Sequence, residues 1–348
     1  SFYFNKSNQL AFFEASTSGE GYELWRTDGT VEGTYLLKDI NPGINSSSIS
    51  FKGQIGNYVL FQALVDGEGR ELWVSDGTSA GTTLLVDLVP GVNSPDLKGF
   101  YEYQGALYFG FGQTNVELWR TQGTPATTSL VLRTATGSGS YNIHYFMEFN
   151  GELFFQGYDS TNRVELWRTD GTSLGTSMVA NVNTAGGSSA SPRGIIANKL
   201  IFSALDSTWK HKLWSLDASD NIVSLLPSGG FMPMNSAVLG DKFIFVVSDA
   251  MGFEPWVTDG TLGGTHVLKD INPSDSSLGS GENWAIIGSL LFFIADDGTV
   301  GSEPWVSDGT TAGTYLLKDI NPGVSGSNLS KPIKIGDKLY FTANSGFG

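Results

Sequence analysis

The chain has 348 residues, of which 40% are hydrophobic and 16% charged, and its 22 Phe, 12 Tyr and 9 Trp supply a packed core that excludes wholesale disorder. The formal net charge of −15 repels phosphate backbones and anionic lipid, so we expect no nucleic-acid partner and no anionic membrane surface as partner. The absence of cysteine excludes disulfides, thiolate metal sites and cysteine nucleophiles.

No apolar run approaches the roughly 18 to 20 residues that a bilayer-spanning helix needs, so the sequence predicts no membrane insertion. No signal peptide is visible. Because the chain starts at Ser1 and not at Met, a leader or further domains upstream are compatible with this sequence.

One motif recurs along the whole chain, in its clearest form as Glu-Leu-Trp-x-x-Asp-Gly-Thr-x-x-Gly-Thr. The copy that departs most from this pattern is the fifth. A period in the 40s, repeated this often, is typical of a repeat architecture. Successive copies start 48, 46, 48, 47, 42 and 49 residues apart, by subtraction of the positions Glu23, Glu71, Glu117, Glu165, Lys212, Glu254 and Glu303.

Each repeat is predicted to form four short antiparallel strands. In the second repeat the expected strands are 51–55, 58–65, 71–75 and 82–88, separated by turns rich in Gly, Asn and Asp. No segment has a sustained helical period with caps, so we expect an all-β protein. Four antiparallel strands per repeat at this period predict a β-propeller, whereas the coils of a parallel β-solenoid are shorter and contain no hairpins.

The chain is predicted to be a single propeller domain, 1–348. An eight-bladed propeller with an incomplete last blade is favoured, because the final strand pair is as well formed as the earlier first pairs. A seven-bladed ring with one surplus pair is the alternative, since a propeller closes to avoid a free strand edge. The expected blades are about 1–43, 44–91, 92–137, 138–186, 187–230, 231–274 and 275–323, with a partial blade at 324–348.

The repeated Trp residues are interpreted as structural. Glu and Trp stand two apart in the third strand, so they project from the same face. A Trp at this place in every repeat is expected to fill the wedge between neighbouring blades, and a platform for stacking sugars is the alternative. These residues are Trp25, Trp73, Trp119, Trp167, Trp214, Trp256 and Trp305.

The Asp-Gly-Thr corner is likewise interpreted as a structural turn. Asp is expected to accept hydrogen bonds from the backbone amides that follow it, and Gly to adopt a positive φ. Each corner offers a single carboxylate, whereas Ca²⁺ takes about six to eight oxygen ligands, so a metal at the corners is disfavoured. The corner residues are Asp28, Asp76, Asp170, Asp259 and Asp308.

Loops on the opposite side of each repeat are more acidic. Two of them, with Asp66 and Glu68 and with Asp296 and Asp297, are candidate Ca²⁺ sites, because carboxylate, Asn and carbonyl oxygens are expected to converge there. The favoured interpretation is an Asx turn followed by Pro, with the Lys of each Lys-Asp-Ile-Asn-Pro segment paired to a nearby Glu such as Glu303. No other cofactor is indicated.

The fifth repeat is the most irregular. Trp209, Lys210 and His211 lie in the loop before its third strand and form a candidate ligand-binding site, whereas tolerated drift of the repeat is the favoured interpretation. No catalytic motif is present, so no catalytic residue is assigned. His144, Tyr145 and Lys210 are residue types that could serve β-elimination of an acidic sugar, and that hypothesis rests on residue type alone.

The repeated run resembles the ELWxxDGT repeat of large bacterial secreted and surface proteins, over about the whole chain. The resemblance implies a β-propeller of extracellular or cell-surface type, and it implies no settled activity. The corner is also similar to the Asp-box hairpin of sialidase-type propellers, where that element is structural and not catalytic.

We therefore expect an extracellular, non-enzymatic propeller that acts as an adhesive, scaffold or filament-forming module. Its candidate partners are other copies of itself, joined through the chain ends. A lectin-like propeller that binds extracellular glycans is the first alternative. A polysaccharide lyase or hydrolase with its site at the central channel is the second.

Overall fold

The structure is a computed structural model, and it describes residues 1–112, 115–134, 143–226, 235–249, 252–278 and 284–346. Within these ranges all regular structure is β-strand, apart from one turn of 3₁₀ helix at Pro125–Thr127. The described residues contain no helix that is long and apolar enough to span a membrane.

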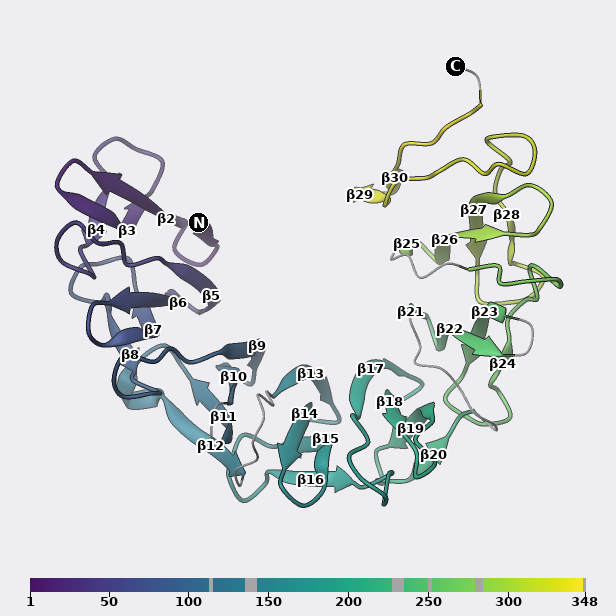
Figure 1. The fold of residues 1–348 in the computed structure, drawn as a ribbon, viewed down its shortest axis with the longest axis horizontal. Coiled ribbons are helices and arrows are strands. Elements are labelled where there is room, and N and C mark those ends of the chain that lie inside the picture. Colours follow the sequence, from purple (N-terminus) through teal and green to yellow (C-terminus); the bar gives the residue numbers. More distant parts are fainter. Residues whose placement is uncertain (113–114, 135–142, 227–234, 250–251, 279–283, 347–348) are drawn as a thin grey trace. The chain divides into compact units, whose positions relative to one another are not determined.

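The strands form separate antiparallel sheets, in each of which a strand pairs with the next one along the chain (Figure 1). We number them as blades in chain order. Blade 1 has β1 (Phe2–Asn5), β2 (Leu10–Thr17), β3 (Glu20–Thr27) and β4 (Tyr35–Lys38). Blade 2 has β5 (Ser50–Ile55), β6 (Tyr58–Val65), β7 (Gly69–Ser75) and β8 (Thr83–Val86). Blade 3 has β9 (Leu97–Tyr103), β10 (Ala106–Gly112), β11 (Val116–Thr121) and β12 (Ser129–Thr134).

The later sheets repeat this order. Blade 4 has β13 (His144–Phe149), β14 (Glu152–Asp159), β15 (Arg163–Thr169) and β16 (Ser177–Ala180), and blade 5 has β17 (Ser191–Ile196), β18 (Lys199–Leu205), β19 (His211–Asp217) and β20 (Ile222–Ser224). Blade 6 has β21 (Ser236–Leu239), β22 (Lys242–Asp249), β23 (Gly252–Thr258) and β24 (His266–Val267), and blade 7 has β25 (Ala285–Ile287), β26 (Leu290–Asp296), β27 (Ser302–Ser307) and β28 (Tyr315–Leu316). The last sheet, which we call the half-blade, has only β29 (Ile333–Ile335) and β30 (Lys338–Tyr340).

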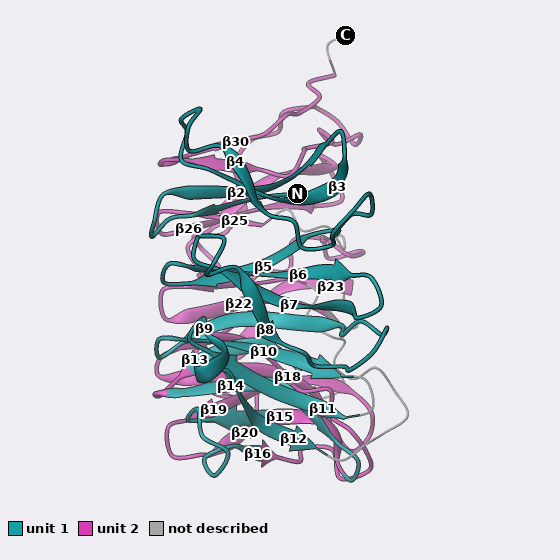
Figure 2. Ribbon diagram, turned by 90° about the vertical axis from the view of Figure 1, so that its left-hand side faces the viewer, with its two compact units in different colours: residues 1–148, 152–161, 167–178 teal, residues 149–151, 162–166, 179–348 magenta. Residues whose placement is uncertain are grey.

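The chain forms two compact units (Figure 2). One unit comprises residues 1–148, 152–161 and 167–178, and the other comprises residues 149–151, 162–166 and 179–348. Blade 4 contributes residues to both.

The hydrophobic core lies between consecutive blades. Val59 and Phe61 of blade 2 pack with Phe12 and Leu24 of blade 1, and one strand position away Leu60 packs with residues of blade 3. Alternate residues of a strand point to opposite faces, so each central strand serves two interfaces. The same arrangement joins blades 5 and 6 and blades 6 and 7.

These four-stranded antiparallel meanders, packed face to face along the chain, are blades of a β-propeller, and the predicted all-β fold class is confirmed. The described residues hold seven four-stranded blades and one two-stranded half-blade, which agrees with eight repeats of which the last is incomplete.

Three connections recur and are named here. The hairpin turn joins the second and third strands of a blade. The corner, which carries Asp-Gly-Thr, joins the third and fourth. The linker runs from the fourth strand to the first strand of the next blade.

Candidate functional site

The corner Asp residues form a closed hydrogen-bond motif. Asp28 Oδ1 accepts from the amide of Thr30 at 2.9 Å and from its hydroxyl at 2.7 Å, and Thr30 Oγ1 in turn accepts from the amide of Gly33 at 2.9 Å. The hydroxyl and amide of Thr30 hold the pKa of Asp28 below its usual value. The same three bonds recur at Asp76, Asp170, Asp259 and Asp308. The carboxylate thus builds the turn.

This motif also explains the second glycine of the repeat. A Cβ built on Gly33 would lie 2.0 Å from Asp28 Oδ1, so no larger residue fits while the carboxylate is in place. Blade 3 has Gln122 at the Asp position and Thr127 at the glycine position. There the amide and hydroxyl of Thr124 pair with Thr127 Oγ1, at 3.2 and 2.9 Å. The Thr127 hydroxyl therefore takes the hydrogen-bonding role that the Asp carboxylate has in the other corners.

In every blade except blade 5 a buried Glu opens the motif, and in blades 1, 2, 4, 6 and 7 it accepts hydrogen bonds from the linker. In blade 3 Glu117 accepts instead from Trp119 and Arg133. Glu23 is fully buried; its Oε2 accepts from the amide of Ile40 at 2.8 Å and its Oε1 from the amide of Ser47 at 2.9 Å. Desolvation raises the pKa of Glu23, and the hydrogen bonds from the linker oppose that rise. Glu254 makes the corresponding bonds to Ile271 and Ser277. This carboxylate is a structural anchor and not a site for chemistry.

Blade 2 carries an incomplete version of the anchor. Glu71 is 4% exposed, and only its Oε2 has a partner, the amide of Leu88 at 3.0 Å. Its Oε1 is buried without a hydrogen bond. Pro95 stands where blade 1 has Ser47, and it offers neither an N–H nor a hydroxyl. Desolvation, with the charge of Asp87 adding to it, raises the pKa of Glu71 to about 7.

None of the repeated Trp side chains is exposed, and four of them lie in clusters that join two blades. Trp73 packs in the cluster that joins blades 1 and 2, Trp119 in that of blades 2 and 3, Trp256 in that of blades 5 and 6, and Trp305 in that of blades 6 and 7. Trp25 and Trp214 stack near the Phe residues opposite them, with ring centroids 6.3 and 6.4 Å apart, and Trp167 is 8% exposed. The indoles of blades 2, 3, 6 and 7 are therefore used in packing between blades.

The pairing expected for the Lys of the Lys-Asp-Ile-Asn-Pro segments is wrong. Lys38 Nζ donates to the carbonyl of Thr82 at 2.7 Å and lies over the Trp73 ring, 5.9 Å from its centroid. Lys269 does the same with Thr314 and Trp305. The buried Glu is already occupied: Glu303 accepts from linker amides and from the Ser327 hydroxyl. The Lys ammonium group instead connects the end of one blade to the corner of the next blade.

The candidate Ca²⁺ residues act as hydrogen-bond acceptors. Asp66 Oδ2 accepts from Asn45 Nδ2 at 2.6 Å, and its Oδ1 accepts from Asn41 Nδ2 at 3.3 Å. Asp296 and Asp297 accept from amides of their own turn. Glu68 lies exposed in the same hairpin turn as Asp66. Among the described residues no group of three or more His, Asp or Glu side chains is arranged to hold a metal ion.

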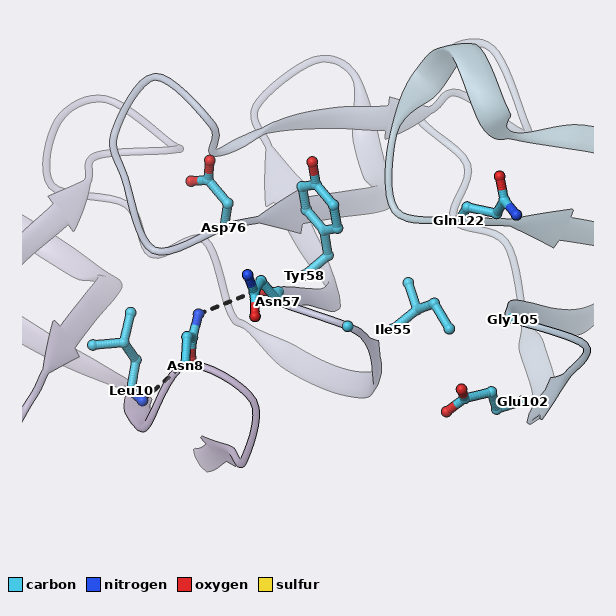
Figure 3. A pocket seen from close by; sticks show the side chains of 10 residues that line it. Asn8, Leu10, Ile55, Asn57, Tyr58, Asp76, Glu102, Gly105 and Gln122 are labelled. Atoms are coloured by element: carbon cyan, nitrogen blue, oxygen red, sulfur yellow. Dashed lines mark hydrogen bonds between the residues drawn. The ribbon is translucent and has the colours of Figure 1, made fainter.

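A pocket of about 630 Å³ lies where blades 1, 2 and 3 meet (Figure 3). Its wall includes the side chain of Tyr58 and two carboxylates from different blades, Asp76 and Glu102. Asn8 Nδ2 donates to the carbonyl of Asn57 at 3.2 Å across one edge. Asp76 is committed to its corner, so the pocket has no paired acid and base.

In the fifth blade the structure brings together two of the three predicted ligand residues in one turn. Trp209 is 58% exposed and has a φ of 61°. Lys210 is exposed beside it, and His211 begins β19. Burial, and then the charge of Arg193, lower the pKa of His211. The imidazole is therefore neutral at pH 7.

The residues proposed for β-elimination lie in two places. His144 and Tyr145 are neighbours in β13 with ring centroids 4.2 Å apart, whereas Lys210 belongs to the β18–β19 turn. Three residues near this turn were not predicted from the sequence: Arg163, Gly186 and Gly187. Gly186 lies against the Trp209 side chain, and Gly187 lies against the Arg163 side chain. The sequence offers little to identify them: a glycine pair in the linker after blade 4, and an Arg where other repeats have a Gly.

No family model and no curated protein matches the chain. One similar solved structure comes from work titled "Structural and Mechanistic Analysis of Two Prolyl Endopeptidases", with 14% identity and a TM-score of 0.48. The similarity covers 86% of this chain and 46% of that one, so the chain spans about half the length of that protein. TolB from Acinetobacter baumannii is 11% identical, with 86% and 77% coverage and a TM-score of 0.36.

Proposed function

We propose that the chain is a non-enzymatic assembly module of an extracellular or cell-surface bacterial protein, which joins copies of itself head to tail as a scaffold or filament. The observation that supports this most is a pair of apolar sheet faces, one on the half-blade and one on blade 1, each of which is exposed within its own compact unit. Each corresponds to a face that is buried in the interior blades.

The half-blade carries the face that elsewhere packs on the following blade. By alignment of the Gly turns, Ile335 and Tyr340 stand where blade 2 has Ile55 and Leu60, which are 6% and 0% exposed. In the half-blade Ile335 is 61% and Tyr340 52% exposed, and Ile333 on the same face is 64% exposed. The opposite face is covered, because the Phe341 ring packs 5.3 Å from that of Phe292.

Blade 1 carries the face that elsewhere packs on the preceding blade. Phe2 lies opposite Phe13, which lies opposite Trp25, so all three share one face of the sheet. The same face of blade 2, with Phe61 and Trp73, is packed on blade 1. In blade 1 Phe2 is 68% and Phe4 44% exposed.

The charges of the two ends are complementary. Residues 324–348 hold three Lys and one Asp, which gives +2, in a chain whose net charge is −15. Residues 1–43 hold three basic residues, which are two Lys and one Arg, and six acidic residues, which are four Glu and two Asp. The net charge of this segment is therefore −3. A positive half-blade of one copy and a negative blade 1 of another attract each other. Because the two faces differ, the contact is heterologous and propagates unless it closes.

Analytical ultracentrifugation over a range of concentrations tests the proposal. The wild-type chain is expected to form a concentration-dependent series of oligomers. Ile335→Lys and Phe2→Lys should each reduce that series to monomers, since a buried charge opposes the contact. Leu174→Lys is the matched control, because Leu174 is 101% exposed in the corner of blade 4 and belongs to neither face.

Mixing the two variants separates head-to-tail assembly from a symmetric dimer. Each variant keeps one intact face, so an equimolar mixture is expected to give dimers and nothing larger. A wild-type chain that stays monomeric at all concentrations would refute the proposal. Symmetric dimers that survive either substitution would refute it equally.

A further inference from the structure

Two hairpin turns place a large side chain in a backbone conformation that favours glycine. In the described parts of the β6–β7, β22–β23 and β26–β27 turns, every residue with a positive φ is a glycine, such as Gly69 at 85° and Gly252 at 98°. In the β14–β15 turn this conformation is taken by Arg163, at 68°, and in the β18–β19 turn by Trp209, at 61°. A left-handed conformation is sterically unfavourable for a residue that has a Cβ.

Burial does not repay that cost, because Trp209 is 58% exposed and Arg163 is exposed. The turn is nevertheless well held. Asp206 Oδ1 accepts from the Thr208 amide at 2.8 Å and the Lys210 amide at 3.2 Å, and Lys212 Nζ lies 3.1 Å from Asp206 Oδ2. The Trp209 amide donates to the Asp206 carbonyl at 2.9 Å. A fixed, exposed indole suits a flat, weakly polar ligand.

Both side chains lie against the same glycine pair. A Cβ built on Gly186 would lie 2.6 Å from Trp209 Cη2, and a Cβ built on Gly187 would lie 2.6 Å from Arg163 Cβ. These two glycines are consecutive in the linker after blade 4, so the indole and the guanidinium-bearing side chain are held on adjacent residues. Larger residues in the linker would displace one or both.

The surroundings carry positive charge in an acidic chain. Lys210 is exposed next to Trp209, and the linker 181–190 has no charged residue. Two carboxylates beside the β14–β15 and β18–β19 turns have partners: Asp159 accepts from the Thr161 amide, and Asp206 is paired with Lys212. The equivalent turn of blade 7, by contrast, carries Asp296 and Asp297.

From this geometry we propose a binding site for an acidic saccharide, independent of the end-to-end assembly. One sugar ring stacks on Trp209, and its carboxylate or sulfate pairs with Arg163 and Lys210. A pyranose ring presents C–H groups to an aromatic face, and a guanidinium fits carboxylate and sulfate in a bidentate manner.

Isothermal titration calorimetry with three probes tests this site: an oligogalacturonate hexamer, a heparin-derived hexasaccharide and neutral cellohexaose. The first two distinguish carboxylate from sulfate as the source of charge. At least one anionic probe is expected to bind on the order of tenfold more tightly than cellohexaose, with an affinity that falls as NaCl is raised.

Two variants restore the glycine of the other turns and so preserve the fold. Trp209→Gly and Arg163→Gly are each expected to weaken anionic binding on the order of tenfold, with an unchanged or raised Tm. Matched controls are Tyr145→Gly, which removes another exposed aromatic with a positive φ, and Lys6→Gly, which removes an exposed charge. Binding of none of the probes, equal binding of all three, or binding that ignores Trp209→Gly would overturn the proposal.

Discussion

Glu71 shows what the loss of one hydrogen-bond partner does to a repeated buried carboxylate. In blade 1 the second oxygen of the anchor Glu accepts from Ser47, whereas in blade 2 Pro95 leaves Glu71 Oε1 without a partner. The ionised form of a buried acid is then poorly solvated, which raises its pKa. The proline in the linker thereby adds to the rise in pKa that burial alone causes at Glu71.

The expected result is a stability that falls as the pH rises from about 4.5, the unfolded value, to about 7, the folded one. A raised carboxyl pKa means that folding favours the protonated form, so the loss is complete above pH 7. It stays below about 3 kcal/mol, because solvent screens part of the carboxylate charge. Pro95→Ser and Glu71→Gln should both flatten this part of the Tm profile. Pro90→Ser, at an exposed linker position, should leave it unchanged; an unaltered profile in Pro95→Ser would contradict the account.

Gln122 and Thr127 provide a second prediction for single residues. In the other described corners, which carry Asp-Gly-Thr, the Asp carboxylate fills the space that a Cβ at the second glycine would need. A Cβ built on Gly81, for example, would lie 2.1 Å from Asp76 Oδ1. Gln122→Asp alone should destabilise the chain, since the new carboxylate competes with Thr127. Adding Thr127→Gly should recover stability. Urea unfolding of the double-mutant cycle is expected to give a coupling of about 1 to 2 kcal/mol, and additive effects would show that the two positions are independent.

Linkers are the elements that the buried Glu residues hold in place. Glu254 Oε2 accepts from the Ile271 amide at 3.0 Å, and Oε1 accepts from the Ser277 amide at 3.1 Å. In Glu254→Gln the side-chain NH₂ faces one of these donors, so one linker amide loses its acceptor, which costs about 1 to 3 kcal/mol.

Hydrogen exchange measured by mass spectrometry reports this loss directly. Glu254→Gln should speed exchange across residues 268–278, while the rest of blade 6 changes little. Asp270→Asn is the control, because Asp270 is an exposed charge at the start of the same linker. Equal effects of the two substitutions would show that charge, and not the buried acceptor, protects the linker.

Strand order within each blade follows from local patterns, and the sequence predicts it well. The run 58–65 was expected as a central strand, and β6 is Tyr58–Val65. Contacts between consecutive blades depend on side chains about 45 residues apart, and no local pattern reports them. Thus Lys38 was expected beside a Glu and instead bonds the Thr82 carbonyl.

The candidate saccharide site shows the same limit at the level of elements. Trp209 could be identified because it stands in a loop of the fifth repeat, which departs most from the motif. Its neighbour Gly186 belongs to the preceding linker, and Arg163 attracts notice only once its φ of 68° is known. The sign of φ at a turn residue depends on the hydrogen bonds of that turn. Loop sequences of different lengths do not reveal these hydrogen bonds.

At the scale of the compact units, the half-blade and blade 1 each carry one apolar sheet face that is exposed within its own unit. Each interior blade covers the next, whereas the half-blade exposes Ile333 and Ile335 and blade 1 exposes Phe2 and Phe4. A repeat array in which every contact is of one kind can add copies by the same contact. The proposed assembly therefore uses the interface that already joins the blades.

Cross-linking of single-cysteine variants tests this claim most directly, because the wild-type chain has no cysteine to interfere. Phe4→Cys and Ile333→Cys proteins are mixed and treated with a short bis-maleimide reagent. The account predicts a cross-linked dimer in the mixture that contains one copy of each variant, and only monomer when either variant is treated alone. Homodimers of a single variant, or no product in the mixture at concentrations where the wild-type chain associates, would contradict it.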